Sequence, residues 1–117
     1  MDDGAMAAEE PIGDMIFADA EDYAASQGYA LGEGAEHHFR SVAEVAATLI
    51  VAAPPGSDDR RAKTAEAIQN FHAMIDAMID ARPAAYAGDA ERMNGNIIGE
   101  VTLAMAHNKL CPIWPFC

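Results

Sequence analysis

"SDDRRAKTAEAIQNFHAMIDAMIDARP", residues 57–83, is the stretch that decides the fold, and its spacing predicts one long α-helix. Ser57 can cap the first turn, and the two aspartates that follow it suit the positive end of the helix dipole. On a helical wheel the apolar side chains cover nearly half of the circumference, which is more than the roughly 100° stripe of a helix with one neighbour. The sequence therefore predicts a central helix over 58–82, ended by Pro83, that contacts two neighbouring helices or one helix and a second copy of the chain.

Two helices are predicted before this central one. Apolar residues at three- and four-residue steps favour a helix over 15–27, and a clearer stripe favours another over 35–52. Gly28 is a stop signal for the first helix, and "PPG" at 54–56 ends the second, because proline lacks the amide hydrogen that a helix needs. The stretch "GYALGEG" between the two helices is predicted to be a loop.

The last regular segment, residues 89–109, carries two conflicting signals. Asn94 and Gly95 form a hairpin-type pair, and alternating apolar residues follow it. The apolar spacing over the whole segment also fits a helix, and the residues before Asn94 make a poor partner strand. A helix is therefore favoured, although the choice between helix and strand over 94–105 stays open.

The composition agrees with a helical fold. The chain has 117 residues, of which 51% are hydrophobic, but 26 of these are alanine, which favours helices that pack closely. We expect an all-α, three- to four-helix bundle formed by a single domain over residues 13–110. A flexible acidic leader, or N-terminal arm, is predicted at 1–12, and an apolar tail at 111–117 is predicted to pack on the bundle or on a partner.

Negative charge is concentrated in the first third of the chain. Residues 1–36 contain ten acidic side chains and no lysine or arginine, and the whole chain has a formal net charge of −12. Such a block repels nucleic-acid phosphates and anionic lipids and attracts a basic protein, and no apolar run is long enough to span a bilayer. We therefore expect a basic protein that contacts Asp19, Glu21 and Asp22, and neither nucleic acid nor membrane as a partner. A solvated face that only keeps the protein soluble is the alternative.

A second partner surface is predicted on the apolar side of the central helix and on the tail. Met74 lies at the edge of the apolar arc, where its soft side chain suits an interface, whereas Met78, Met93 and Met105 suit the core. If nothing covered it, the tail segment "PIWPF" would expose a compact apolar group. The expected contacts, either in a homodimer or with another protein, are Met74, Met78, Trp114 and Phe116.

The tail "HNKLCPIWPFC", residues 107–117, also carries the residues best suited to a cofactor. His107, Cys111 and Cys117 offer one nitrogen and two sulfur ligands, which suit zinc or copper, and a Cys-Pro pair can present a thiolate to haem. The cysteine spacing is looser than in a structural zinc site, and a fourth ligand is missing. The start of the chain lacks the features of a secretory signal, so a cytoplasmic location is expected, and that setting argues against a persistent disulfide.

Function follows from the sequence less directly than fold. The sequence has no nucleophile motif, phosphate-binding glycine loop or zinc-protease motif, so we expect no enzymatic activity and no cofactor. The expected function is that of a non-enzymatic protein-binding module, such as a small acidic inhibitor, an immunity protein or a chaperone-like adaptor. The alternatives are a helical protein that binds zinc, copper or haem through its C-terminal His and Cys residues, and a precursor whose C-terminal Cys/Trp/Pro segment is modified.

Overall fold

The computed structural model describes residues 12–117. The acidic leader predicted at 1–12 lies outside the described residues, apart from Ile12, which is the first residue of a helix. None of the described helices combines the length and the apolar character needed to cross a membrane.

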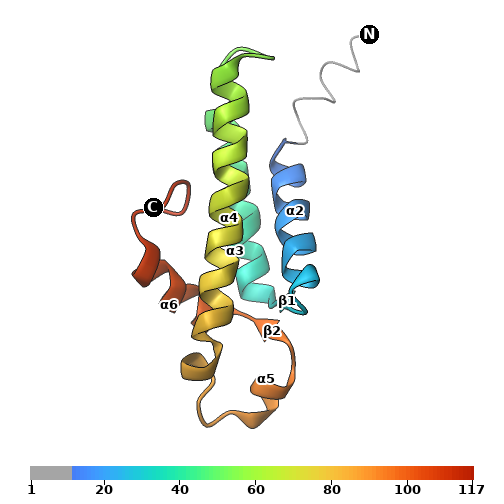
Figure 1. The fold of residues 1–117 in the computed structure, drawn as a ribbon, viewed down its shortest axis with the longest axis vertical. Helices are drawn as coiled ribbons and strands as arrows, with labels where there is room; N and C mark the ends of the chain where they lie inside the picture. Colours follow the sequence, from blue (N-terminus) through green and yellow to red (C-terminus); the bar gives the residue numbers. More distant parts are fainter. Residues whose placement is uncertain (1–11) are drawn as a thin grey trace.

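Helices make up most of the described chain, which confirms the predicted all-α class in its coarse form. In Figure 1, α2, α3 and α4 run side by side along the long axis of the molecule, and α6 packs against α4. We call these four helices the helical body. The elements in chain order are α2 (Ile12–Ser26), β1 (Ala30–Leu31), α3 (Glu33–Val51), α4 (Asp58–Ala85), α5 (Ala90–Asn94), β2 (Ile97–Ile98) and α6 (Glu100–Leu110).

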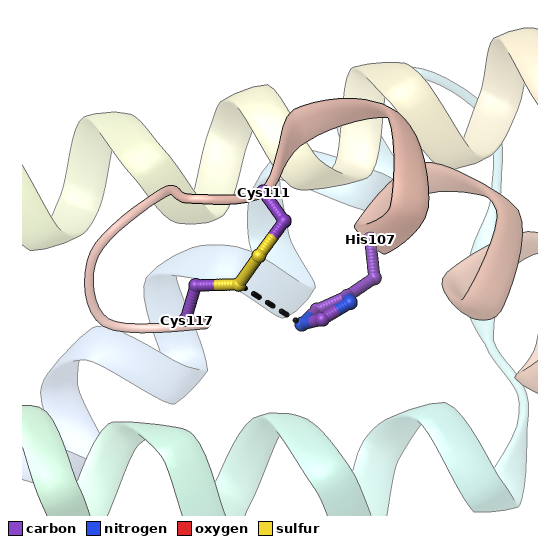
Figure 2. Close-up of side chains that lie close together, drawn as sticks. All are labelled: His107, Cys111 and Cys117. Atoms are coloured by element: carbon purple, nitrogen blue, oxygen red, sulfur yellow. Dashed lines mark hydrogen bonds between the residues drawn. A yellow bond between two sulfur atoms is a disulfide. The ribbon is translucent and has the colours of Figure 1, made fainter.

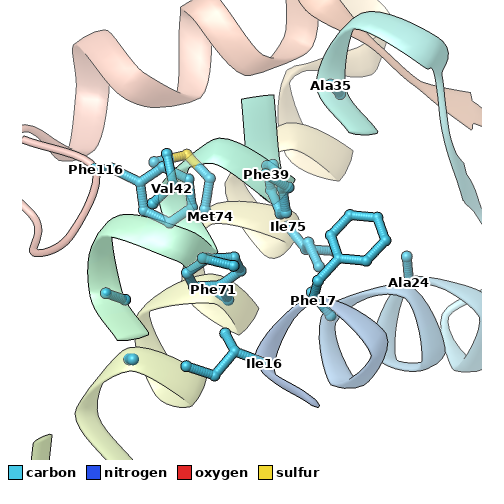
Figure 3. Close-up of a cluster of buried hydrophobic side chains, with 14 of the residues drawn as sticks. Ile16, Phe17, Ala24, Ala35, Phe39, Val42, Phe71, Met74, Ile75 and Phe116 are labelled. Carbon is cyan, nitrogen blue, oxygen red and sulfur yellow. The ribbon is translucent and has the colours of Figure 1, made fainter. Parts of the chain in front are cut away.

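The core forms where α4 meets its neighbours. Phe71 on α4 contacts Phe39 on α3 edge-on, with their ring centroids 5.3 Å apart, and both rings are fully buried (Figure 3). Ile75 and Met78 continue the same buried face of α4 by one turn each. Burial of side chains of this size stabilises a fold by roughly 1.5–3 kcal/mol each, so this face of α4 provides much of the stability.

Met74 is a correction to the sequence prediction. Its side chain is fully buried in the core, so it does not lie at a surface interface. The wide apolar arc of α4 is covered within the chain, because α2, α3 and α6 all pack against this helix. Met78 is fully buried, which agrees with its assignment to the core and not with its place among the expected partner contacts, whereas Met105 was predicted in the core and is 38% exposed. Met93, also predicted in the core, is half-buried.

Helix α4 begins as predicted and ends later than predicted. The Ser57 side chain accepts a hydrogen bond from the amide of Arg60 at 3.1 Å, which caps the first turn. The predicted end at Pro83 is wrong, because the helix continues to Ala85 and the amide of Tyr86 still donates to the carbonyl of Arg82. A proline removes one intrahelical hydrogen bond, and so close to the end of a helix the remaining bonds are sufficient to continue it.

The segment over 94–105 is neither the favoured continuous helix nor a hairpin. The chain leaves α5 at Asn94 and forms β2, which pairs in parallel with β1 from the predicted "GYALGEG" loop. The amide of Ala30 donates to the carbonyl of Asn96 at 2.8 Å, and the amide of Gly32 donates to the carbonyl of Ile98 at 2.9 Å. Helix α6 then begins at Glu100.

A buried arginine holds this C-terminal connection in place. Arg82, in the last turn of α4, is only 6% exposed. Its guanidinium donates to the carbonyls of Arg92, Met93, Gly95 and Ile97, at distances from 2.5 to 3.0 Å. The planar group supplies several donors in a fixed arrangement, which suits a turn whose carbonyls converge. Arg82 therefore satisfies the backbone carbonyls of the α5–β2 connection, which in a regular sheet would accept hydrogen bonds from a neighbouring strand.

Candidate functional site

The seven residues after α6 form a closed loop, which we call the C-terminal loop (residues 111–117). Figure 2 shows the disulfide between Cys111 and Cys117, whose Cα atoms are 5.9 Å apart. The expectation that these cysteines lack a disulfide is therefore wrong for this structure. Their side by side position follows from the turn made by the intervening residues, in which the amides of Phe116 and Cys117 both donate to the carbonyl of Ile113.

The C-terminal loop is attached to the helical body by contacts that do not involve the disulfide. Phe116 is 7% exposed and inserts between Phe39 and Phe71, with ring centroids 5.3 and 4.8 Å away. The Asn70 side chain of α4 donates to the carbonyl of Trp114. Trp114 itself is half-buried, and the ammonium of Lys63 lies 5.8 Å from the centroid of its ring. The apolar part of the tail thus packs on α3 and α4.

His107 is positioned beside the sulfur atoms. It lies in the last turn of α6, where its Nε2 atom is 3.0 Å from the carbonyl oxygen of Phe116 and 3.6 Å from the Sγ atom of Cys117 (Figure 2). The ligand atoms of His107, Cys111 and Cys117 all lie within 4.8 Å of one another. The structure therefore brings together the three residues that the sequence predicted as metal ligands, with the two sulfur atoms bonded to each other.

A groove of about 470 Å³ runs beside His107, between α3 and α6. His37 and His38 from α3 line one side, and His107 and Glu100 from α6 line the other. Burial lowers the pKa of His38 below its usual value, and the neighbouring His107 and then His37 lower it further. The crowding of three imidazoles was not predicted, because only the packing of α3 on α6 brings His107 to the adjacent pair.

Acidification should destabilise the protein through His38. Because its pKa is lower in the folded chain than in the unfolded chain, the unfolded chain takes up a proton first as the pH falls. The stabilisation is thus fully present above the usual pKa of histidine, near 6.5, and is lost as the pH falls from there through the folded value. Thermal unfolding measured between about pH 7.5 and about pH 5.5 should show a falling midpoint, and His38→Gln should flatten this decrease. If the unfolding midpoint of the variant fell with pH as much as that of the parent protein, the pH dependence would not be due to His38.

The acidic surface lies on α2 and the start of α3. Glu21 and Asp22 are exposed on α2, and the half-buried Glu36 on α3 interacts with Glu21. Partial burial raises the pKa of Glu21, and the hydrogen bond and the negative charge of Glu36 raise it further, whereas Arg40 opposes the shift. We call Glu21, Asp22 and Glu36 the acidic face.

Asp19 was predicted to contact a partner, and the structure pairs it inside the chain. Its carboxylate lies 2.7 Å from the Nε2 atom of His72 on α4, and the His72 ring stacks on Tyr23 with centroids 4.0 Å apart. The Tyr23 hydroxyl donates to Asp76 at 2.6 Å, which raises the pKa of the Tyr23 phenol above its usual value. Asp19 therefore helps to join α2 to α4.

Two of the predicted apolar partner contacts are also placed inside the molecule. Met74 and Met78 have no exposed surface, so neither can form the predicted self-association face without unfolding the core. Phe116 is buried as well, and Trp114 is half-buried. Of the predicted partner-binding residues, Glu21 and Asp22 are the ones that remain exposed.

Comparison with known proteins gives no match to this chain among family models, curated proteins or solved structures.

Proposed function

We propose that this protein is a non-enzymatic helical-bundle module that binds a basic protein through the acidic face formed by Glu21, Asp22 and Glu36. The observation that carries the proposal is the close approach of the Glu21 and Glu36 side chains, from α2 and α3, in a region without lysine or arginine; after partial burial, this approach adds to the raised pKa of Glu21. Like charges held together on a folded surface cost free energy, and groups perturbed in this way gather at functional sites. A cationic side chain placed between the two carboxylates would remove this cost.

The surroundings of the acidic face favour a positively charged partner. Residues 12–36 contain six acidic side chains and no lysine or arginine. Arg40, the cation that opposes the rise in the pKa of Glu21, lies over the ring of Phe17 with its guanidinium carbon 4.2 Å from the centroid, so part of its surface is already in contact. A chain with net charge −12 would also steer a basic partner toward itself, which raises the association rate at low salt.

This proposal gives the helical body the role of a scaffold. The hydrogen bond between Asp19 and His72 and the stacking of Tyr23 on His72 fix α2 on α4, which holds the α2 part of the acidic face in one orientation. A rigid arrangement of charges loses little conformational entropy on binding. Such a surface suits an inhibitor, an immunity protein or an adaptor. Self-association as a homodimer stays a prediction and, with Met74 and Met78 buried, would have to use other residues.

The acidic face should be tested with charge-neutralising variants and a matched control. A lysine-rich peptide serves as the probe, and its affinity is measured by titration calorimetry at several salt concentrations. Glu21→Gln, Asp22→Asn and Glu36→Gln together should weaken binding about tenfold and reduce its salt dependence, because charge pairs at a protein surface contribute roughly 0.2–1 kcal/mol each. The control variant neutralises three exposed acids elsewhere, by Glu66→Gln, Asp80→Asn and Glu91→Gln.

The control separates a local site from a general effect of net charge. Both variants lose three negative charges, so any difference between their affinities for the peptide is due to where the removed charges lie. The proposal requires the control to bind with less than about a threefold loss of affinity. Equal losses in the two variants would mean that the peptide responds to net charge alone, and the acidic face would then have no special role.

A further inference from the structure

We propose that reduction of the disulfide between Cys111 and Cys117 converts the C-terminal loop into a binding site for a thiophilic metal ion, zinc(II) or copper(I), with His107 as the third ligand. The acidic face is not involved, so this inference is independent of the proposed protein-binding function.

The separation of the three side chains fits a common metal ion. A zinc–sulfur bond is about 2.3 Å long, so two sulfur atoms on one zinc ion can be at most about 4.6 Å apart. The Nε2 and Sγ atoms of His107, Cys111 and Cys117 already lie within 4.8 Å of one another. Breaking the sulfur–sulfur bond lets the two sulfur atoms move apart to this range by small rotations of their side chains.

The contacts that attach the C-terminal loop would hold the ligands together after reduction. Phe116, next to Cys117, remains buried between two core phenylalanines, and Asn70 remains hydrogen-bonded to the carbonyl of Trp114. Cys111 directly follows α6, which also carries His107 one turn earlier. Both thiols are therefore fixed near the imidazole from two sides. Pre-arranged ligands of this kind reduce the entropy that metal binding would otherwise cost.

The chemistry balances with a dithiol reductant. The reductant supplies two electrons and two protons, the Cys111–Cys117 bond becomes two thiols, and the reductant becomes a disulfide. Each thiol then loses a proton as its thiolate binds the metal ion, so binding of one ion releases two protons. The imidazole of His107 contributes the lone pair of Nε2, which requires its ring proton to be on Nδ1 and replaces the contact with the carbonyl of Phe116.

The ligand set selects the class of metal. Thiolate and imidazole ligands favour copper(I) and zinc over magnesium, calcium or manganese, which prefer oxygen. Three protein ligands leave one position of a tetrahedral zinc ion for water. Both cysteines are exposed at the surface, so an ion and a water molecule can reach this position from solvent. The site would thus be open, unlike the closed four-ligand sites that hold structural zinc.

The experiment compares oxidised and reduced forms of the full chain. The disulfide is reduced with a phosphine, which becomes a phosphine oxide by taking oxygen from water, and the excess phosphine is removed before metal is added. Zinc(II) is then titrated without air against a chromogenic chelator, and cobalt(II) is used to detect thiolate-to-metal charge transfer. We expect one equivalent of metal on the reduced protein, with a charge-transfer band, and none on the oxidised protein. Equal binding by the two forms, or no binding to the reduced form, would overturn the proposal.

Variants at the histidines distinguish a ligand from a structural residue. His107→Gln should weaken zinc binding by the reduced protein at least about tenfold, since even residues outside the ligand set often change affinity by that factor. His37→Gln, in the same groove, is the matched control and should bind like the parent protein. Because His107→Gln also loses the contact with Phe116, His107→Cys provides a second variant, which should retain one equivalent with a stronger charge-transfer band. Loss of binding in His107→Cys, or unchanged affinity in His107→Gln, would contradict the assignment.

Discussion

Truncation of Phe116 to alanine is expected to lower the free energy of unfolding by about 3–5 kcal/mol. The ring lies between Phe39 and Phe71 and is 7% exposed, so its removal leaves a cavity beside the face of α4 that forms the core. Figure 3 draws it in the same buried cluster as Phe39 and Phe71. Small domains have a total stability of only about 5–15 kcal/mol, so this change would remove a large part of it. Chemical denaturation followed by circular dichroism measures the loss.

Two further variants test whether the effect of Phe116→Ala comes from packing. Phe116→Leu replaces most of the lost volume and should cost less than the alanine variant, within about 1.5 kcal/mol of the parent protein if its neighbours adjust. Trp114→Ala removes a larger side chain from the same loop, but one that is only half-buried. It should therefore cost less than Phe116→Ala. A loss below about 1 kcal/mol for Phe116→Ala would show that the C-terminal loop is not part of the core.

Replacement of Arg82 by leucine should destabilise the protein by about 3 kcal/mol or more. Hydrogen bonds to a charged group contribute about 1.5–3 kcal/mol each, and this guanidinium donates to four carbonyls of the α5–β2 connection. Leucine fills part of the space and supplies no donor, so these carbonyls would have to be satisfied by water. We expect unfolding at lower denaturant and faster amide exchange over residues 92–98.

Lysine and a surface arginine provide the comparisons for this experiment. Arg82→Lys keeps the charge but has no planar fork, so its stability should lie between those of the parent protein and Arg82→Leu. Arg61→Leu removes an exposed arginine that pairs with Asp58 and should cost no more than about 1 kcal/mol. If Arg82→Leu were no less stable than Arg61→Leu, the buried guanidinium would not hold the connection.

The long helices were predictable because their signals are local. Ser57, the acidic first turn and the proline pair before it define where α4 begins, and the structure places that boundary within one residue of the prediction. The spacing of the apolar residues also predicted more than one neighbour for α4. Of the two alternatives left open for that arc, neighbouring helices or a second copy of the chain, the structure has the first, because α2, α3 and α6 all pack against α4 and Met74 is fully buried.

The C-terminal connection could not be predicted because its cause is not local. β2 exists only because β1 offers backbone partners from the other end of the chain, and a two-residue pairing has no detectable periodicity. Arg82 looked like an ordinary basic residue in the last turn of a helix, since nothing in the sequence indicates that four carbonyls converge on it. Similarly, the sequence alone could not distinguish Asp19 from Glu21, because only the packing of α2 on α4 brings His72 to Asp19.

The metal-ligand candidates were found in sequence because His107 and Cys111 are one helical turn apart. Their distance from Cys117 depends on how the loop turns, which the two prolines and the aromatic residues do not specify by themselves. The expected cytoplasmic setting argued against a disulfide. In the structure, the turn of the C-terminal loop brings Cys111 and Cys117 into bonding distance, and they are paired.

The short parallel pair has a consequence for the order in which the chain assembles. β1 and β2 are separated in sequence by the whole of α3 and α4, so their pairing closes a loop that contains both of the longest helices. Closure of so long a loop costs chain entropy, and two pairs of residues return little of it. The helices must therefore already be docked before the strands meet, and the final step of folding should depend on contacts far apart in sequence, which are slow to form.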